Sequence, residues 1–163
     1  MSRISLRQSL LAVAAVTLLA PTKAGAESVN VSLPASVSFF VANVSASTTG
    51  SPDPTAISFD SADLVLGNRL RISVQADAAD FNPPTTGTAI PASKVSWTTS
   101  GAVGGTGSNG TLSSSSYSQV YQSNPSPSFG SVNVIWELAA PGSGIRAGDH
   151  TLTVRWKLES VAP

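Results

Sequence analysis

The sequence has no cysteine and only one histidine in 163 residues. Without cysteine there are no disulfides, so small disulfide-bonded scaffolds are excluded and the fold must be stabilised by its core. A transition-metal site would need unusual ligands. A catalytic triad would have to use His150, and no serine lies in a Gly-x-Ser-x-Gly pattern. We therefore predict that the protein is not an enzyme and holds no cofactor or metal.

His150 follows Asp149 at the start of the last expected strand, where we predict a surface or strand-capping role. The other carboxylates are scattered along the chain. Two close pairs, Asp60 with Asp63 and Asp77 with Asp80, offer the oxygen ligands that Ca²⁺ takes. Neither pair belongs to a twelve-residue calcium loop, so the sequence leaves calcium binding open.

Long apolar runs are scarce, and the single one, Leu10–Ala20, is too short to span a bilayer. Two arginines precede it and Ala24-Gly25-Ala26 follows it, which is typical of a secretory signal peptide and its cleavage site. We predict that residues 1–26 are a signal peptide and that residues 27–163 form a single domain with no transmembrane segment. The domain is expected outside the cell, on the cell surface or in the periplasm.

Positive charge is also limited. The full sequence has nine basic and nine acidic residues, and three of the basic ones lie within residues 1–26. The remaining chain therefore carries six basic residues against nine acidic ones. A strongly basic surface is excluded, so nucleic acid is not an expected partner.

Apolar residues show no helical spacing after residue 26. Instead, short alternating runs are separated by clusters of glycine, proline and serine, a pattern typical of an all-β sandwich or barrel. We predict an immunoglobulin-like β-sandwich of about seven to nine mostly antiparallel strands. The expected strands are Val29–Leu33, Val37–Val44, Ala56–Phe59, Arg69–Ala76, Lys94–Thr99, Ser118–Gln122, Val132–Leu138 and Thr151–Glu159, with a further short candidate at Leu64–Leu66.

The clearest alternation lies in the two C-terminal strands, which contain Trp136 and Trp156. Alternation places one set of side chains on one face of a pleated strand. Trp97 has the same inward parity in its own strand. We expect these three tryptophans to be structural residues of the core between the sheets.

Four basic residues fall on the opposite parity of two strands: Arg69 and Arg71 in one, Arg155 and Lys157 in the other. If the two strands share a sheet, its outer face carries all four charges. Such a face is either simply solvated or binds anions or a wall polymer. Tyr117 and Tyr121 follow the loop-like, glycine-rich stretch 101–116 and are interpreted as half-buried structural residues, with a sugar-binding patch as the alternative.

The stretch 29–44 keeps one apolar parity on both sides of Pro34. Proline cannot donate to a strand ladder, so it belongs at an edge or at a switch between sheets. One interpretation is a first strand that passes from one sheet to the other. The other is a strand donated to a neighbouring molecule, with self-association through residues 28–44.

Two Trp-x-Leu triplets, Trp136-Glu137-Leu138 and Trp156-Lys157-Leu158, both expected to point their Trp and Leu inward, lie on these C-terminal strands. With them, residues from about Ile57 to Pro163 resemble the WxL domain of bacterial cell-surface proteins. Such domains are exported, cysteine-free and all-β, and they attach non-covalently to the cell wall through peptidoglycan. A different immunoglobulin-like envelope protein with the same core arrangement fits the residues as well.

The expected function is therefore that of a non-catalytic, exported envelope or surface protein that binds a cell-wall glycan or another surface protein. The alternative is a structural subunit of a pilus-like fibre, assembled by donation of the N-terminal strand.

Overall fold

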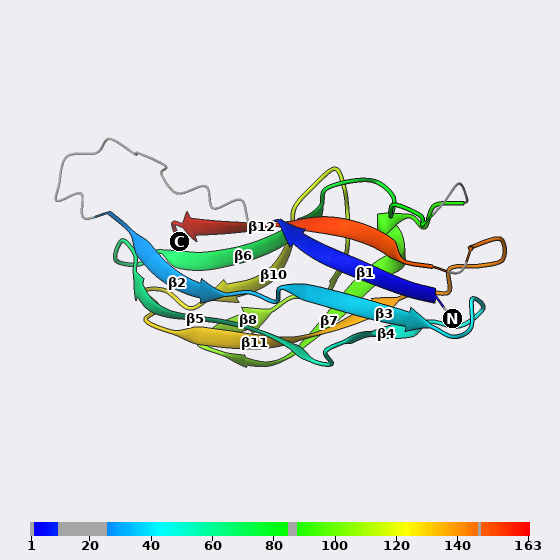
Figure 1. Ribbon diagram of the computed structural model, residues 1–163. Coiled ribbons are helices and arrows are strands. Elements are labelled where there is room, and N and C mark those ends of the chain that lie inside the picture. The colour runs from blue at the N-terminus through cyan, green and yellow to red at the C-terminus, as the bar shows by residue number, and fades with distance from the viewer. Residues whose placement is uncertain (1, 10–25, 85–87, 147) are drawn as a thin grey trace.

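The computed structural model describes residues 2–9, 26–84, 88–146 and 148–163. Within them the chain forms twelve strands and one short 3-10 helix, and the strands make two layers packed face to face (Figure 1). The prediction of an all-β sandwich is confirmed, while immunoglobulin-like connectivity stays a prediction. The elements are β1 (Ser2–Ser9), β2 (Ser28–Ser32), β3 (Ser36–Val41), β4 (Thr48–Ser51), β5 (Thr55–Asp63), β6 (Arg69–Ala76), η1 (Ala92–Lys94), β7 (Val95–Val103), β8 (Gly105–Gly107), β9 (Gly110–Thr111), β10 (Ser118–Ser123), β11 (Gly130–Leu138) and β12 (His150–Val161).

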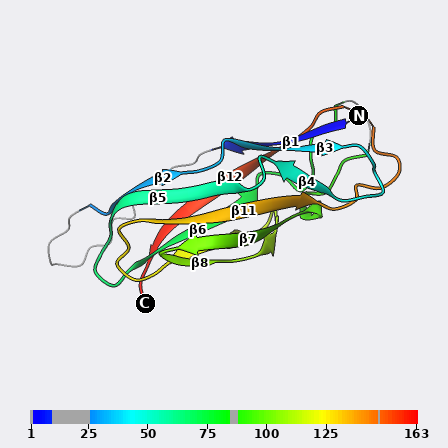
Figure 2. The same ribbon diagram turned by 90° about the horizontal axis from the view of Figure 1, so that it is seen from below.

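The two layers are joined at one end by β4. Sheet A has the strand order β4-β3-β1-β12-β6-β10-β8, and sheet B has the order β2-β5-β11-β7-β9. Strand β4 pairs with β3 of sheet A and with β11 of sheet B (Figure 2). Of the strand pairs in the described residues, all are antiparallel except β1 with β12.

Each of the eight expected strands has a counterpart, and β1, β4, β8 and β9 are additional. Residues 64–66 form no strand. The short strands β4, β8 and β9 lack alternation because they are built from Gly, Ser and Thr and pair by close approach. At Gly50 of β4, an added Cβ would lie 2.5 Å from Val37 Cγ1 and 3.1 Å from Trp136 Cβ, so only glycine lets this strand pack against the core.

Pro34 lies at a switch between the sheets. Strand β2 pairs with β5 in sheet B, and β3 pairs in sheet A, with Leu33, Pro34 and Ala35 between them. The backbone of the chain thus follows the first of the two interpretations of this stretch. Strand β2 is an edge strand, since β5 is its only partner in the described residues.

The three tryptophans lie together in the core. Their exposed fractions are 1% for Trp97, 2% for Trp136 and 3% for Trp156. The ring centroids of Trp97 and Trp136 are 5.4 Å apart, and those of Trp136 and Trp156 are 6.4 Å apart in an edge-to-face arrangement. Because Trp97 and Trp136 belong to sheet B and Trp156 to sheet A, this contact connects the two layers.

The two tyrosines have different environments. Tyr121 is buried, and its hydroxyl donates a hydrogen bond to the carbonyl oxygen of Val103 at 2.8 Å. Burial raises the pKa of Tyr121 above the ordinary value. Tyr117 is 38% exposed on the outside of the sandwich. Tyr121 is therefore a core residue, and only Tyr117 is open to a ligand.

We predict that Trp136→Ala lowers the free energy of unfolding by about 3–5 kcal/mol, because it removes the central ring of the stack and leaves a cavity. The matched control is Ile135→Ala, on the outer face of the same strand, where the side chain is 36% exposed and the loss should be about 1 kcal/mol or less. Urea unfolding of both variants measures the difference. Equal midpoints would contradict the assignment of Trp136 to the core.

Candidate functional site

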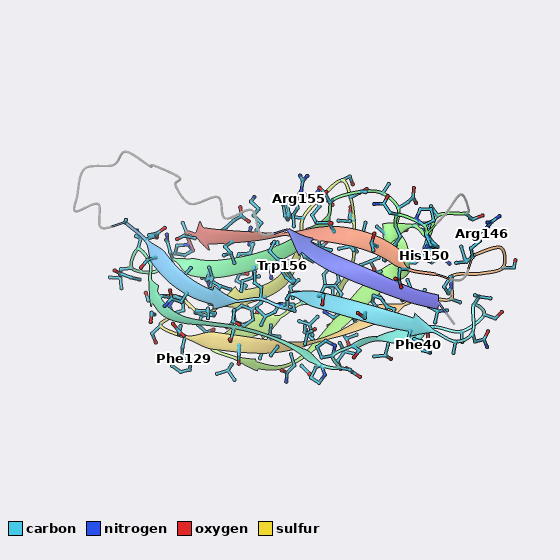
Figure 3. All side chains as sticks on the ribbon, in the orientation of Figure 1. Phe40, Phe129, Arg146, His150, Arg155 and Trp156 are labelled. Carbon is cyan, nitrogen blue, oxygen red and sulfur yellow. The ribbon has the colours of Figure 1, made fainter. Side chains whose placement is uncertain are left out.

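The four basic residues singled out from the sequence share one face of sheet A. Strands β6 and β12 are neighbours, with Arg155 opposite Gln75, Lys157 opposite Ser73, and Glu159 opposite Arg71. Arg155 and Lys157 are exposed, and Arg69 and Arg71 are half-buried. Figure 3 shows Arg155 on the outer side of β12 and Trp156 on its inner side.

Acidic partners neutralise part of this face. Arg155 forms an ion pair with Asp77, and Lys157 Nζ lies 2.6 Å from Glu159 Oε1. Lys157 Nζ also lies 5.6 Å from the ring centroid of Tyr117, which is a cation–π geometry. Two of the four positive charges are therefore paired, and the half-buried Arg69 and Arg71 form no ion pair within the described residues.

His150 is fully buried at the first position of β12, so the prediction of a surface place was wrong. Its Nε2 lies 3.0 Å from the carbonyl oxygen of Arg146, and its Nδ1 has no hydrogen-bond partner in the described chain. Residues 2–9, 26–84, 88–146 and 148–163 hold no group of three or more His, Asp or Glu side chains arranged for a metal ion. Of the carboxylates considered for calcium, Asp60 accepts a hydrogen bond from Asn30 and Asp77 pairs with Arg155.

A second candidate lies in the middle of sheet A, where β1 fills the space between β3 and β12. The six residues Ile4–Ser9 pair in parallel with His150–Arg155, and the six residues Ser2–Arg7 pair in an antiparallel ladder with Ser36–Val41. Figure 1 shows β1 lying alongside both neighbours. We call this position, bounded by Ser36–Val41 and His150–Arg155, the strand slot.

The strand slot is bordered by core residues. Ile4 lies opposite Phe39 and His150 in the two ladders, and each of these neighbours is fully buried. The next pair of inward neighbours along the slot is Val37 and Leu152, both buried at 3% exposure. Residues that face each other across a ladder lie on the same side of the sheet, so the slot opens directly onto the core.

A small cavity lies where the slot continues past β1, lined by Pro34, Ala35, Ser36, Val37, Trp136, Val154 and Trp156. Its volume is about 10 Å³, room for a single water molecule. The indole N–H groups of the three tryptophans differ here. Trp97 donates to the carbonyl oxygen of Ser108 and Trp136 to Thr55 Oγ1, both at 2.8 Å, whereas Trp156 Nε1 is buried without a partner among the described residues.

Leu158 extends this incompletely covered region. It has the inward parity of Trp156 and lies opposite the buried Ile72, yet it is 36% exposed. Leu158 thus has the inward parity expected for the second Trp-x-Leu triplet, but its side chain is only partly covered. In the described residues the ladder of β1 on β12 ends at Arg155, three residues before Leu158.

The sequence reasoning missed the strand slot because β1 belongs to residues 1–26, the predicted signal peptide. The alternation of Ile4 and Leu6 with polar residues in Ser2–Ser9 was the available signal. The structure includes residues 2–9, so it describes the chain with this segment attached.

No protein-family model matches the sequence, and comparison with curated proteins finds no match. In the part of the chain that the structure describes, no helix has the length and apolar character required to cross a membrane.

We predict that Trp156→Phe costs less free energy of unfolding than Trp136→Phe. Both substitutions remove the same volume. Only Trp136→Phe breaks a hydrogen bond, the one to Thr55, whereas Trp156→Phe removes a buried donor for which the described part of the chain offers no partner. The expected difference is about 1 kcal/mol. Urea unfolding of the two variants side by side measures it, and an equal or larger cost at Trp156 would show that its indole N–H is bonded.

Proposed function

We propose that the protein is an exported, non-catalytic β-sandwich of the cell envelope or surface, and that it binds another polypeptide by strand addition. In this proposal the signal peptide is cleaved after residue 26, and the strand slot of sheet A loses β1. The observation that carries the proposal is the place of β1, inside a sheet and between two core-facing strands, in a segment that cleavage would remove.

Removal of β1 would leave backbone groups without hydrogen bonds and apolar side chains without cover, and an extended chain can restore both. The ladder partners of β1 on β3 and β12 would lose their backbone hydrogen bonds along six residues on each side. The inward side chains Val37, Phe39 and Leu152 would lose the strand that lies beside them in the sheet. An added strand restores both the backbone bonds and the apolar cover, which is the mode of β-augmentation.

A small-molecule ligand does not meet these requirements. The cavity beside Trp156 has room for about one water molecule, far below the few hundred Å³ of typical ligand pockets. A polypeptide partner therefore fits the slot better than a sugar or a cofactor does. Until cleavage, the signal peptide itself keeps the slot filled.

The test compares the protein recovered after export with the uncleaved full chain. A fluorescent peptide with the sequence of Ser2–Ser9 should bind the exported protein and raise its unfolding midpoint, because it refills the slot, and should bind the uncleaved chain at least ten-fold more weakly. The control peptide carries Asp at the positions of Ile4 and Leu6, which would place charge against Phe39 and Leu152. Failure of the exported protein to take up the first peptide would contradict the proposal.

Binding of a wall polymer is the second candidate. It is supported by the exposed Tyr117 ring beside Lys157 and by the resemblance of the two Trp-x-Leu triplets to WxL domains, which bind the cell wall. The exposed Tyr117 ring suits stacking on a sugar ring, and Lys157, although paired with Glu159, has further N–H groups that can donate to sugar hydroxyls.

For this candidate we expect the exported protein to sediment with purified cell walls, and the double variant Tyr117→Ala, Lys157→Ala to lose most of that binding. Phe129→Ala, at another exposed aromatic residue, serves as the control. Sedimentation that is absent, or unaffected by the double variant, would exclude this face as the wall-binding surface.

A further inference from the structure

We propose that the polypeptide in the strand slot of the exported protein is the segment Ser28–Leu33 of a second copy of this chain. This inference rests on the proposed function, since it requires a slot vacated by cleavage. Within one chain this segment pairs with β5. The proposal is that β2 leaves β5 of its own chain and pairs with β3 and β12 of a second copy.

The pattern of the segment fits the slot. The two ladders of β1 are offset and together span Ser2–Ser9, so Ser28–Leu33, a run of six, would pair over five residues with each wall. Pro34, which has no N–H to donate, ends the run. Val29, Val31 and Leu33 recur at every second position. Placed in the orientation of β1, Val29 takes the position of Ile4, and Val31 takes that of Leu6.

The third inward position of the slot, occupied by Gln8 in β1, suits Leu33 of a second copy better than it suits the signal peptide. In β1 the polar residue Gln8 lies opposite the buried Val154. In the donated segment Leu33 takes this position, next to the cavity lined by Val154 and Trp156. An apolar residue opposite buried apolar neighbours stabilises a ladder more than an amide does, so the segment from a second copy fits the slot better than the strand it replaces.

Strand β2 is weakly held in its own sheet. It is an edge strand, and its side chains alternate between exposed and half-buried, with none fully buried. The polar contacts near it are exposed: Asn30 Nδ2 donates to Asp60 Oδ1 at 3.1 Å, and Glu27 Oε1 accepts from Val65 N at 2.7 Å and Ser160 Oγ at 2.8 Å. Its exchange uncovers the half-buried Val29, Val31 and Leu33, which pack against the core, but moves no fully buried residue. Residues 33–35 provide the connection about which it turns.

The test uses engineered cysteines, because the chain has none of its own. In the proposed register Ser32 takes the place of Arg7, opposite Thr153. Exported Ser32→Cys protein mixed with exported Thr153→Cys protein should form a mixed disulfide dimer under mild oxidation. Ser32→Cys mixed with Lys157→Cys is the matched control, since residue 157 lies on the same face of β12 but beyond the slot.

A reversible lock provides the second arm. Ser32 and Ser58 are ladder partners within one chain, so the double variant Ser32→Cys, Ser58→Cys should form a disulfide that holds β2 on β5. The locked protein should sediment as a monomer, and reduction should restore concentration-dependent association. Val31→Asp should reduce association at least ten-fold, whereas Ser32→Asp, on the outward parity, should change it little.

The outcomes separate this inference from the proposed function. A Ser32–Thr153 cross-link, together with association that the lock abolishes and reduction restores, supports exchange between copies, whether closed pairs or longer chains form. A monomer at every concentration, with no cross-link but with uptake of the synthetic peptide, overturns the inference and leaves a different polypeptide as the partner. Absence of peptide uptake as well overturns both.

Discussion

The structure depends on the packing of three indole rings across the interface of the two sheets. Trp136 of sheet B lies between Trp97 of its own sheet and Trp156 of sheet A. In a chain without cysteine, this apolar contact has to do what a covalent link between the layers does in small disulfide-bonded domains. It fixes β12 in the interior of sheet A, where a strand needs a neighbour on both sides. Trp156, on β12, therefore links the packing of the core to the strand that pairs with β12 in the strand slot.

Much of this fold could be predicted from alternation. Eight strands were predicted because their inward side chains are mostly apolar and their outward ones mostly polar, and Pro34 indicated the switch between sheets because it lacks a donor. The short strands β4, β8 and β9 could not be predicted in this way. They consist of small residues whose pairing results from close approach of backbones, as at Gly50, and nothing in their local sequence encodes that contact.

The candidate site was predictable only in part. Parity placed Arg69, Arg71, Arg155 and Lys157 on one face, but it did not reveal the acidic partners, because the ion pair of Arg155 with Asp77 depends on how neighbouring strands end. Parity also predicts the direction in which a side chain points, but it does not predict which residues cover that side chain. Leu158 points inward and is exposed, and His150 is polar and buried, because coverage is decided by neighbouring strands far away in sequence.

The central place of β12 has a mechanical consequence. Tension applied at the C-terminus would act along a strand of twelve residues that is paired over eight residues with β6 and over six with β1. Such a load shears many hydrogen bonds at once, whereas an edge strand such as β8, paired over three residues with β10, is peeled one bond at a time. The same geometry that places β12 next to the slot thus makes it the strand best suited to transmit force through the molecule.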